Sequence, residues 1–451
     1  KAVFGVPLLL NLQRTGQALP TCIQASFSYL RKTSLDSVGI FRKSGVRSRI
    51  QKLRNLNESN PYNDTYEDQQ AYDVADMLKQ YFRDLPEALL TNKWSETFIS
   101  IFLYIPHMDR LDALHAAIML MPDENREVLQ SLIAFLQEVC KNADENQMTA
   151  TNLAACLAPS LFHLTTTANN KNVSSRRSKT VGVPDQRELN EIRAAHECLT
   201  YMIMNYRHLF SVSEELLRRS VLTEWSPSTL EELHCFTDNG YSNWKSIVDE
   251  CIQEFQRNSK DKAKWWIAVQ NTENVEISYK KVDDLHPLRL WRITVDVEAP
   301  PVEVLNRILR ERNVWDNRLL KSRVVCRLDK QSEVFHYVRS SLWPLPKRDY
   351  CVFRSWKTDL RKGTCLLVEQ SVDHHDATPV LEGVRVTVLT SNYHIEPCGA
   401  GKSRVTHYSR VDSRGRSPEW YNKVFGHICA VDLVHLRDSF NHGSEGPETK
   451  V

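Results

Sequence analysis

The chain is organised around one stretch, Val38-Gly39-Ile40-Phe41-Arg42-Lys43-Ser44-Gly45. Glycine tolerates backbone angles that other residues avoid, so a glycine on each side of the arginine permits a sharp loop. Ile40 and Phe41 supply apolar surface that can fix such a loop to a core. Arg42 is then left to project outward, and we interpret the stretch as a loop that presents a cation.

An arginine presented in this way can act on another protein. Offered in trans, a guanidinium stabilises the charge that builds on a transferring phosphoryl group, an effect worth roughly 10³–10⁵ in rate. The simpler alternative is a basic surface loop, because Lys43, Arg47 and Arg49 lie close together and runs of charge are usually solvated. The loop alone leaves both interpretations open.

A second stretch favours the first interpretation. Residues 73–85 place apolar side chains at helical spacing: Val74, Met77, Leu78, Phe82 and Leu85. Lys79 and Arg83 share the opposite face, where two like charges four residues apart cost about 0.2–0.5 kcal/mol. We expect an acidic partner or a loop carbonyl to offset that cost.

Three separated motifs of the first half resemble the signature blocks of the RhoGAP domain. They are Gly39-Ile40-Phe41-Arg42-Lys43-Ser44, Leu78-Lys79-Gln80-Tyr81-Phe82-Arg83-Asp84-Leu85-Pro86-Glu87 and Met148-Thr149-Ala150-Thr151-Asn152-Leu153-Ala154. Their order and spacing agree with that family as well as their content. The chain departs from the family after the third block, where Ala158-Pro159 stands in place of the usual Gly-Pro.

The resemblance implies an all-helical activator of Rho-family GTPases over roughly the first 210 residues. Arg42 would be its arginine finger. Lys79 and Arg83 would brace the finger loop and meet the GTPase, and Asn152 would contact the switch region of the GTPase. Such an activator is not an enzyme with machinery of its own. It needs no cofactor, because the partner GTPase binds the GTP and Mg²⁺.

Composition sets broad limits on the chain. Its 451 residues are enough for two or three domains with separate cores. A formal net charge of +2 argues against bulk electrostatic attraction to nucleic acid or to an anionic membrane. The 11 cysteines form no C-x-x-C pair and no cluster at zinc-ligand spacing, which predicts reduced thiols in a cytosolic protein and no metal site. Because the chain begins at Lys1, we interpret it as a fragment.

Helical patterns fill residues 1–212, which we expect to form the first domain. A polar stretch at about 165–184 interrupts them and is expected to be a flexible insertion. Within it, Arg176-Arg177-Ser178 is either a phosphorylation or phospholipid-contact site or simply part of a solvated loop. The helix that begins near Asn146 is expected to stop at Pro159. A connector at 213–228 follows.

Residues 229–440 change from a helical to a strand period. After a helix from Trp244 to about Phe255, apolar positions alternate along four segments: Trp291, Ile293, Val295 and Val297; Val334, His336 and Val338; Val384, Val386 and Val388; Val405, His407, Ser409 and Val411. We expect antiparallel strands with one apolar face, one short helix near 302–312, and a polar tail at 441–451.

The last helix is expected to begin at Pro418 and to face the sheet. Its predicted apolar stripe consists of Trp420, Val424, Ile428, Val431 and Val434. A curved sheet opposite such a helix would enclose a concave, mostly dry space suited to an apolar ligand. A filled core is the alternative, which periodicity does not exclude.

Motifs of this half resemble the START lipid-transfer domain, a helix-grip fold of the α+β class. They are Asn313-Val314-Trp315-Asp316, Lys347-Arg348-Asp349-Tyr350 and the helix from Pro418. In cholesterol-binding members an arginine a few residues after the Arg-Asp pair points into the lipid tunnel, and Arg354 holds that place here. The alternative for Arg354 is an exposed position on a strand, because a buried charge is costly without a partner.

A RhoGAP domain followed directly by a START domain is the arrangement of the deleted-in-liver-cancer family, and the whole chain resembles the C-terminal part of a member. The resemblance implies Rho signalling to the actin cytoskeleton, a lipid ligand or membrane contact, and no nucleic-acid partner. It also implies a cytoplasmic location, with focal adhesions and the membrane periphery as candidate sites. Two alternatives stay open: a scaffold that binds a GTPase without catalysis, and lipid transfer as the main activity.

Two local motifs suggest other chemistry. Gly399-Ala400-Gly401-Lys402-Ser403 resembles the end of a phosphate-binding loop, but Glu396 stands where the first glycine is needed and the next segment alternates as a strand. We therefore expect a hairpin turn. His374-His375-Asp376 has no further ligand at suitable spacing and precedes Pro379, so we expect a surface loop.

Overall fold

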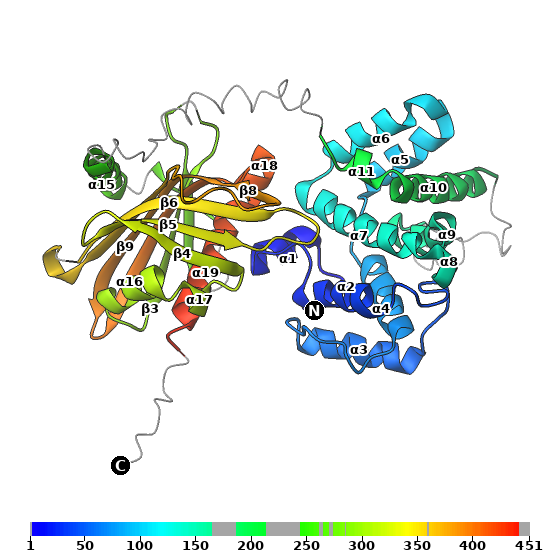
Figure 1. Ribbon diagram of the computed structural model, residues 1–451, viewed down its shortest axis with the longest axis horizontal. Coiled ribbons are helices and arrows are strands. Elements are labelled where there is room, and N and C mark those ends of the chain that lie inside the picture. The colour runs from blue at the N-terminus through cyan, green and yellow to red at the C-terminus, as the bar shows by residue number, and fades with distance from the viewer. Residues whose placement is uncertain are drawn as a thin grey trace, which may run out of the picture. The chain divides into compact units, whose positions relative to one another are not determined.

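The computed structural model describes residues 2–164, 186–212, 244–260, 265–269, 274–284, 286–358 and 360–441. The chain divides into a compact helical unit that ends at Glu214 and a compact mixed unit that begins at Glu215 (Figure 1). The expected insertion at 165–184 and connector at 213–228 lie outside the described residues, as does the expected tail at 441–451 beyond its first residue. Each unit has its own core and is described by itself.

Helices build the first unit, and its described residues contain no strand. They are α1 (Leu8–Thr15), α2 (Thr21–Thr33), α3 (Arg47–Ser59), α4 (Ala71–Arg83), α5 (Asn92–Tyr104), α6 (Arg110–Met119), α7 (Asp123–Lys141), α8 (Ala143–Asn146), α9 (Ala150–Leu161), α10 (Gln186–Met204) and α11 (Tyr206–Leu209). Side-chain caps fix two starts: Thr91 accepts from the N–H of Trp94, and Thr149 accepts from the N–H of Asn152.

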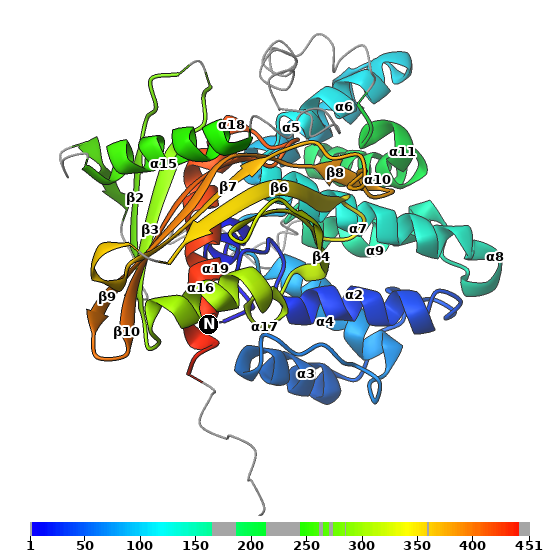
Figure 2. The ribbon, with the colours of Figure 1, turned by 60° about the vertical axis from the view of Figure 1, so that its left-hand side comes forward.

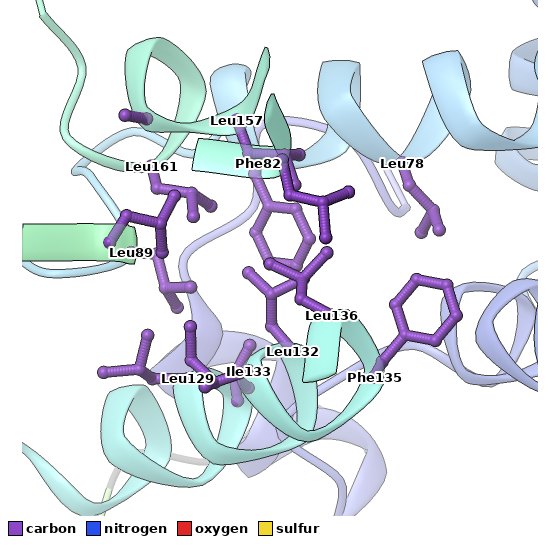
Figure 3. Packing of buried hydrophobic residues seen from close by; sticks show 14 of the residues in the cluster. Leu78, Phe82, Leu89, Leu129, Leu132, Ile133, Phe135, Leu136, Leu157 and Leu161 are labelled. Carbon is purple, nitrogen blue, oxygen red and sulfur yellow. The ribbon is translucent and has the colours of Figure 1, made fainter. Parts of the chain in front are cut away.

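The core of this unit lies where α4, α7 and α9 meet. Leu78 and Phe82 of α4 face Leu132 and Phe135 of α7, with Leu157 of α9 above them (Figure 3). All five side chains are fully or almost fully buried. The apolar spacing predicted for residues 73–85 is therefore the buried stripe of α4.

Two helix ends differ from the prediction. Helix α9 continues to Leu161 through Pro159, because the proline lies in the last turn and is exposed there. The carbonyl that Pro159 leaves without a backbone donor belongs to the exposed Ala155, which water can reach. The pattern of residues 47–55 predicts a short basic helix, which continues to Ser59 as α3. Its polar Asn57 is buried and donates to the hydroxyl of Tyr66 at 2.8 Å, so a residue typical of a loop belongs to the core.

A sheet of ten strands dominates the second unit. The strands are β1 (Ile267–Val269), β2 (Glu276–Lys280), β3 (Leu290–Val297), β4 (Leu319–Arg327), β5 (Ser332–Arg339), β6 (Lys347–Lys357), β7 (Cys365–Ser371), β8 (Gly383–Arg385), β9 (Thr387–Gly399) and β10 (Lys402–Asp412). Their order is β1-β2-β3-β10-β9-β7-β6-β5-β4, with antiparallel neighbours, and β8 pairs with β6 in parallel. The hairpin expected near 399–403 joins β9 to β10.

Helices cover both faces of this sheet (Figure 2). They are α15 (Trp244–Lys260), α16 (Pro301–Arg310), α17 (Arg312–Trp315), α18 (Pro418–Trp420) and α19 (Gly426–Asp438). Phe255 of α15 packs on Leu366 and Tyr408, on the face opposite the one that α19 covers through Gly426 and Trp291. The expected combination of a helical domain with an antiparallel sheet and a C-terminal helix is thus confirmed. The single short helix expected near 302–312 is two, α16 and α17.

The stripe predicted for the last helix is wrong beyond its first turn. Residues Tyr421–Phe425 form a π-helical turn, which inserts one extra residue and rotates every later side chain. The buried positions after it are therefore Gly426, Cys429, Ala430, Leu433 and Leu436, while Ile428, Val431 and Val434 are only half-buried. The rotation also brings Gly426 against the ring of Trp291.

Candidate functional site

The loop between α2 and α3 turns sharply at its centre. Gly39 has φ 74° and Phe41 has φ 67°, a left-handed conformation that is costly for a phenylalanine. The N–H groups of Arg42 and Lys43 both donate to the carbonyl of Gly39, at 2.9 and 2.8 Å. The ring of Phe41 is buried against Phe135, with the centroids 5.9 Å apart. This anchoring directs Phe41 inward, and Arg42 is exposed.

Helix α4 holds both sides of this loop. Lys79 Nζ donates to the carbonyl of Phe41 at 2.9 Å and forms an ion pair with Asp76 at 2.6 Å. The N–H of Gly45 donates to the same Asp76 at 2.8 Å, and the N–H of Val46 donates to Asp73 at 2.7 Å. The expected acidic partner and loop carbonyl are therefore both present for Lys79.

Helix α9 brings Asn152 to the same region. Asn152 is half-buried, and its Nδ2 donates to the carbonyl of Gln147 at 3.1 Å. Cys156 lies one turn further along α9, where burial raises the pKa of its thiol while the charges of Lys79 and Arg42 act to lower it. The α9 face that carries Asn152 and Cys156 therefore lies near the loop of Arg42.

Arg83 differs from Lys79 in its contacts. It is exposed, and the described residues give it no hydrogen bond or ion pair. Sequence reasoning missed the residues that hold the loop: Asp73, Asp76 and Asn146, whose carbonyl accepts from the N–H of Gly39 at 2.7 Å. The three-residue spacing of Asp76 and Lys79 in the sequence could have indicated these contacts, but it is equally typical of an ordinary ion pair within a helix.

The second unit contains a buried ion pair at Arg354. The side chains of Arg354 and Glu333 are both 0% exposed, and their charged groups are 2.6 Å apart. Arg354 also donates to the carbonyl of Leu309 at 2.8 Å and lies over the ring of Phe335. The alternative of an exposed strand arginine is therefore wrong, because Glu333 supplies the partner that burial requires.

Two buried polar atoms, one on Arg354 itself and one on the neighbouring strand, have no hydrogen-bond partner in the described part of the chain. Arg354 Nη1 and Glu369 Oε1 make no hydrogen bond within the described residues, although Arg354 and Glu369 face each other across β6 and β7. Burial lowers the pKa of Arg354. Burial acts to raise the pKa of Glu333, but Arg310 and Arg354 outweigh it and hold that pKa below its ordinary value.

The acidic residues of the second unit's two motifs serve as internal anchors. Asp349 is buried and contacts Arg385 at 2.7 Å and His336 at 3.2 Å. Asp316 is buried and contacts Arg339, which also contacts Asp432 of α19 at 2.8 Å. Burial acts to raise the pKa of Asp432, but Arg339 and Arg318 hold it well below its ordinary value. These ion pairs attach the last helix to β5.

One group of side chains has the composition of a metal site. Ligand atoms of His374, His375 and Asp376 lie within 4.8 Å of one another in the described part of the chain. His374 is buried rather than exposed, and its ring is hydrogen-bonded: Nδ1 accepts from the N–H of Asp376 at 3.1 Å, and Nε2 lies 3.6 Å from the sulfur of Cys326. Both nitrogens of this histidine are in use.

Comparisons with known proteins match both units. A family model of the RhoGAP domain matches residues 20–166, and a model of the START domain matches residues 246–442. StAR-related lipid transfer protein 13 from Homo sapiens is 51% identical over 457 residues, covering 100% of this chain and 41% of that protein. Rho GTPase-activating protein 7 from Bos taurus is 53% identical over 454 residues, covering 99% of this chain and 40% of that protein.

A solved structure, the human StarD13 (DLC2) lipid transfer and protein localization domain, is 51% identical and covers 42% of this chain and 95% of that one, with a TM-score of 0.39. The chain spans about two fifths of the length of the curated relatives it matches. None of the described helices is both long and apolar enough to cross a membrane. With a RhoGAP domain followed by a START domain, and relatives that match it from end to end, the chain belongs to the deleted-in-liver-cancer family.

Proposed function

We propose that this chain accelerates GTP hydrolysis by a Rho-family GTPase through Arg42, which acts in trans as an arginine finger. The observation that carries the proposal is the loop itself. Its strained Phe41 is anchored in the core, its backbone is held by Lys79, and the next side chain, Arg42, is exposed. A loop built only for solubility has no need of a buried anchor directly before an exposed arginine.

The chemistry follows from the guanidinium. Arg42 would enter the nucleotide site of the partner and stabilise the charge that develops between the β- and γ-phosphates, while the partner holds Mg²⁺ and positions the attacking water. A guanidinium presents a planar fork of donors to two oxygens, which an ammonium group does not. The exposed Arg83 and the half-buried Asn152 are the remaining groups proposed to contact the GTPase.

Single-turnover GTP hydrolysis by purified Rho-family GTPases tests this proposal. Arg42→Ala should remove most of the stimulation, roughly a 10³-fold loss or more, and Arg42→Lys should restore little of it. Arg47→Ala is the matched control, because Arg47 is also exposed but begins α3 rather than occupying the turn. An undiminished rate with Arg42→Ala would end the proposal. If the wild-type chain binds the GTPase but does not stimulate hydrolysis, the scaffold alternative is favoured.

We also propose that the second unit binds a lipid that carries a small polar group. Support comes from the unpaired donor of Arg354 and the unpaired acceptor of Glu369, which lie opposite each other in the buried part of the sheet. A buried polar atom without a partner is costly, and a ligand hydroxyl could satisfy both atoms. A location at focal adhesions or at the membrane periphery is part of the same proposal and rests on the family alone.

Mass spectrometry of lipid extracted from the purified chain tests this second activity. Wild type should carry or take up lipid from vesicles, and Arg354→Met should change which polar lipids are retained. A chain that stays empty in the presence of sterols, glycerolipids and phospholipids contradicts the proposal. GTPase stimulation measured on the same samples shows whether Arg354→Met leaves the first unit intact.

A further inference from the structure

A single ion pair on α4 meets the loop of Arg42 on both of its sides. Before Arg42, Lys79 Nζ donates to the carbonyl of Phe41 at 2.9 Å. After it, the N–H of Gly45 donates to Asp76 Oδ2 at 2.8 Å. Lys79 Nζ and Asp76 Oδ1 are 2.6 Å apart, so the two side chains connect the two sides of the loop.

The residues between these two contacts are otherwise held by their own turn, in which the N–H groups of Arg42 and Lys43 donate to the carbonyl of Gly39. Arg42, Lys43 and Ser44 are all exposed. The incoming side of the loop is fixed by the buried ring of Phe41 and by the carbonyl of Gly39. The outgoing side depends on carboxylates of α4, because the N–H groups of Gly45 and Val46 donate to Asp76 and Asp73.

The environment strengthens the contacts of Asp76. Its side chain is 13% exposed and that of Lys79 is 15% exposed, so water competes weakly for either charge. Hydrogen bonds to a charged group are roughly twice as strong as neutral ones. A lysine side chain loses rotamer entropy when it is fixed. The carboxylate of Asp76 restricts Lys79 before any partner arrives, which directs its ammonium group to the carbonyl of Phe41.

We propose that Asp76 is a positioning residue for Arg42, an inference that rests on the proposed function of that arginine. Asp76 holds Gly45 directly and Phe41 through Lys79, and so sets the height and direction at which the guanidinium leaves the surface. Its contribution is to the geometry of the reacting complex rather than to the affinity for the GTPase. Loss of Asp76 should therefore act on the maximal stimulated rate.

A purely structural role is the competing explanation. Asp76 and Lys79 are three residues apart on one helix, and such pairs stabilise helices. The chain offers a matched control for that explanation, because Asp123 and Arg126 form an ion pair at the same spacing on α7. Asp123→Ala removes an equivalent helix pair without touching the loop of Arg42.

The first experiment is single-turnover hydrolysis of GTP by a responsive Rho-family GTPase with increasing amounts of the full chain. Asp76→Ala should lower the maximal rate by roughly 10- to 100-fold and change the half-saturating concentration by less than about twofold. Asp76→Asn, which keeps an acceptor for Gly45 but loses the charge opposite Lys79, should fall between Asp76→Ala and wild type. Asp123→Ala should keep the wild-type maximal rate even where its thermal stability is lower.

The second experiment repeats Asp76→Ala in the Arg42→Ala background. If Asp76 acts through the guanidinium, the double variant should be no slower than Arg42→Ala alone. An equal loss in both backgrounds would overturn the proposal, as would a loss that appears wholly in the half-saturating concentration. Amide exchange gives a structural readout, because Gly45 should exchange faster in Asp76→Ala while the core of α7 does not change.

These measurements separate the two levels of inference. Wild-type stimulation by Asp76→Ala together with an inactive Arg42→Ala overturns the role of Asp76 and leaves the arginine finger in place. Full stimulation by Arg42→Ala overturns the proposed function itself. A slow Asp76→Ala, together with a double variant that is no slower than Arg42→Ala alone, supports both.

Discussion

Replacing Glu333 with glutamine is the sharpest test of how the second unit holds a buried charge. Glu333 has no exposed surface, and it contacts the fully buried Arg354 and the partly exposed Arg310. Glutamine has nearly the same shape, so packing is preserved while the negative charge is lost. Arg354 then loses its ion-pair partner and keeps only neutral acceptors, the amide oxygen of the new side chain and the carbonyl of Leu309.

The expected cost follows from that loss. Removing one partner of a buried ion pair destabilises a protein by about 3–5 kcal/mol, because the other charge is left without compensation. Arg354→Met should cost clearly less. It removes the buried cation together with its desolvation penalty, and Glu333 keeps the two-pronged contact with Arg310 at 2.8 and 3.0 Å. The informative result is therefore which of the two variants loses more stability.

Hydrogen exchange of the full chain measures the loss of stability of the second unit separately from the first. Peptides from β5 and β6 should lose protection by roughly two to nearly four orders of magnitude in Glu333→Gln, at about 1.4 kcal/mol for each factor of ten. Peptides from α4 and α7 serve as the internal reference. If Arg354→Met lowers the stability of β5 and β6 as much as Glu333→Gln does, or more, the destabilisation does not come from an uncompensated arginine and the reasoning fails.

Two further predictions concern the same unit. Burial lowers the pKa of His407 to about 3, so the unfolded chain binds a proton first as the pH falls below the ordinary histidine value. Stability should therefore be full above pH 6.5 and fall by about 1.4 kcal/mol per pH unit below it, a slope that denaturant titrations should find reduced in His407→Gln. Gly426→Ala should cost about 1–3 kcal/mol in thermal unfolding, because the added methyl group meets the ring of Trp291. An unchanged melting temperature would contradict that contact.

Periodicity predicted the parts of the fold in which each element keeps one regular repeat. Helix α4 and strand β3 have their apolar residues at the spacing that the sequence indicated, and these residues are buried. The last helix shows the limit of this reasoning. Its π-helical turn changes the phase of the stripe after Phe425, and the extra residue is accommodated through packing against β3 that the local sequence does not encode.

The candidate site was predictable to a similar degree. The sequence placed Arg42 in a loop and Lys79 on the polar face of a helix, because both signals are local. Only the family resemblance implied that Lys79 braces the loop. The sequence did not indicate Asp73 and Asp76 as the acceptors for Gly45 and Val46, since that contact joins segments about thirty residues apart. Hydrogen bonds between distant backbone and side-chain groups leave no periodic trace.

Arg42 and Arg354 show why local context does not decide the fate of a charge. Each follows a β-branched residue and a phenylalanine, Ile40-Phe41 in one case and Val352-Phe353 in the other. Both phenylalanines are buried. Arg354 lies opposite Glu333 in the register of β5 and β6, and that carboxylate offsets the desolvation cost of burying the guanidinium. Arg42 has no described carboxylate partner within the chain, and its guanidinium is exposed, as the role proposed for it in trans requires.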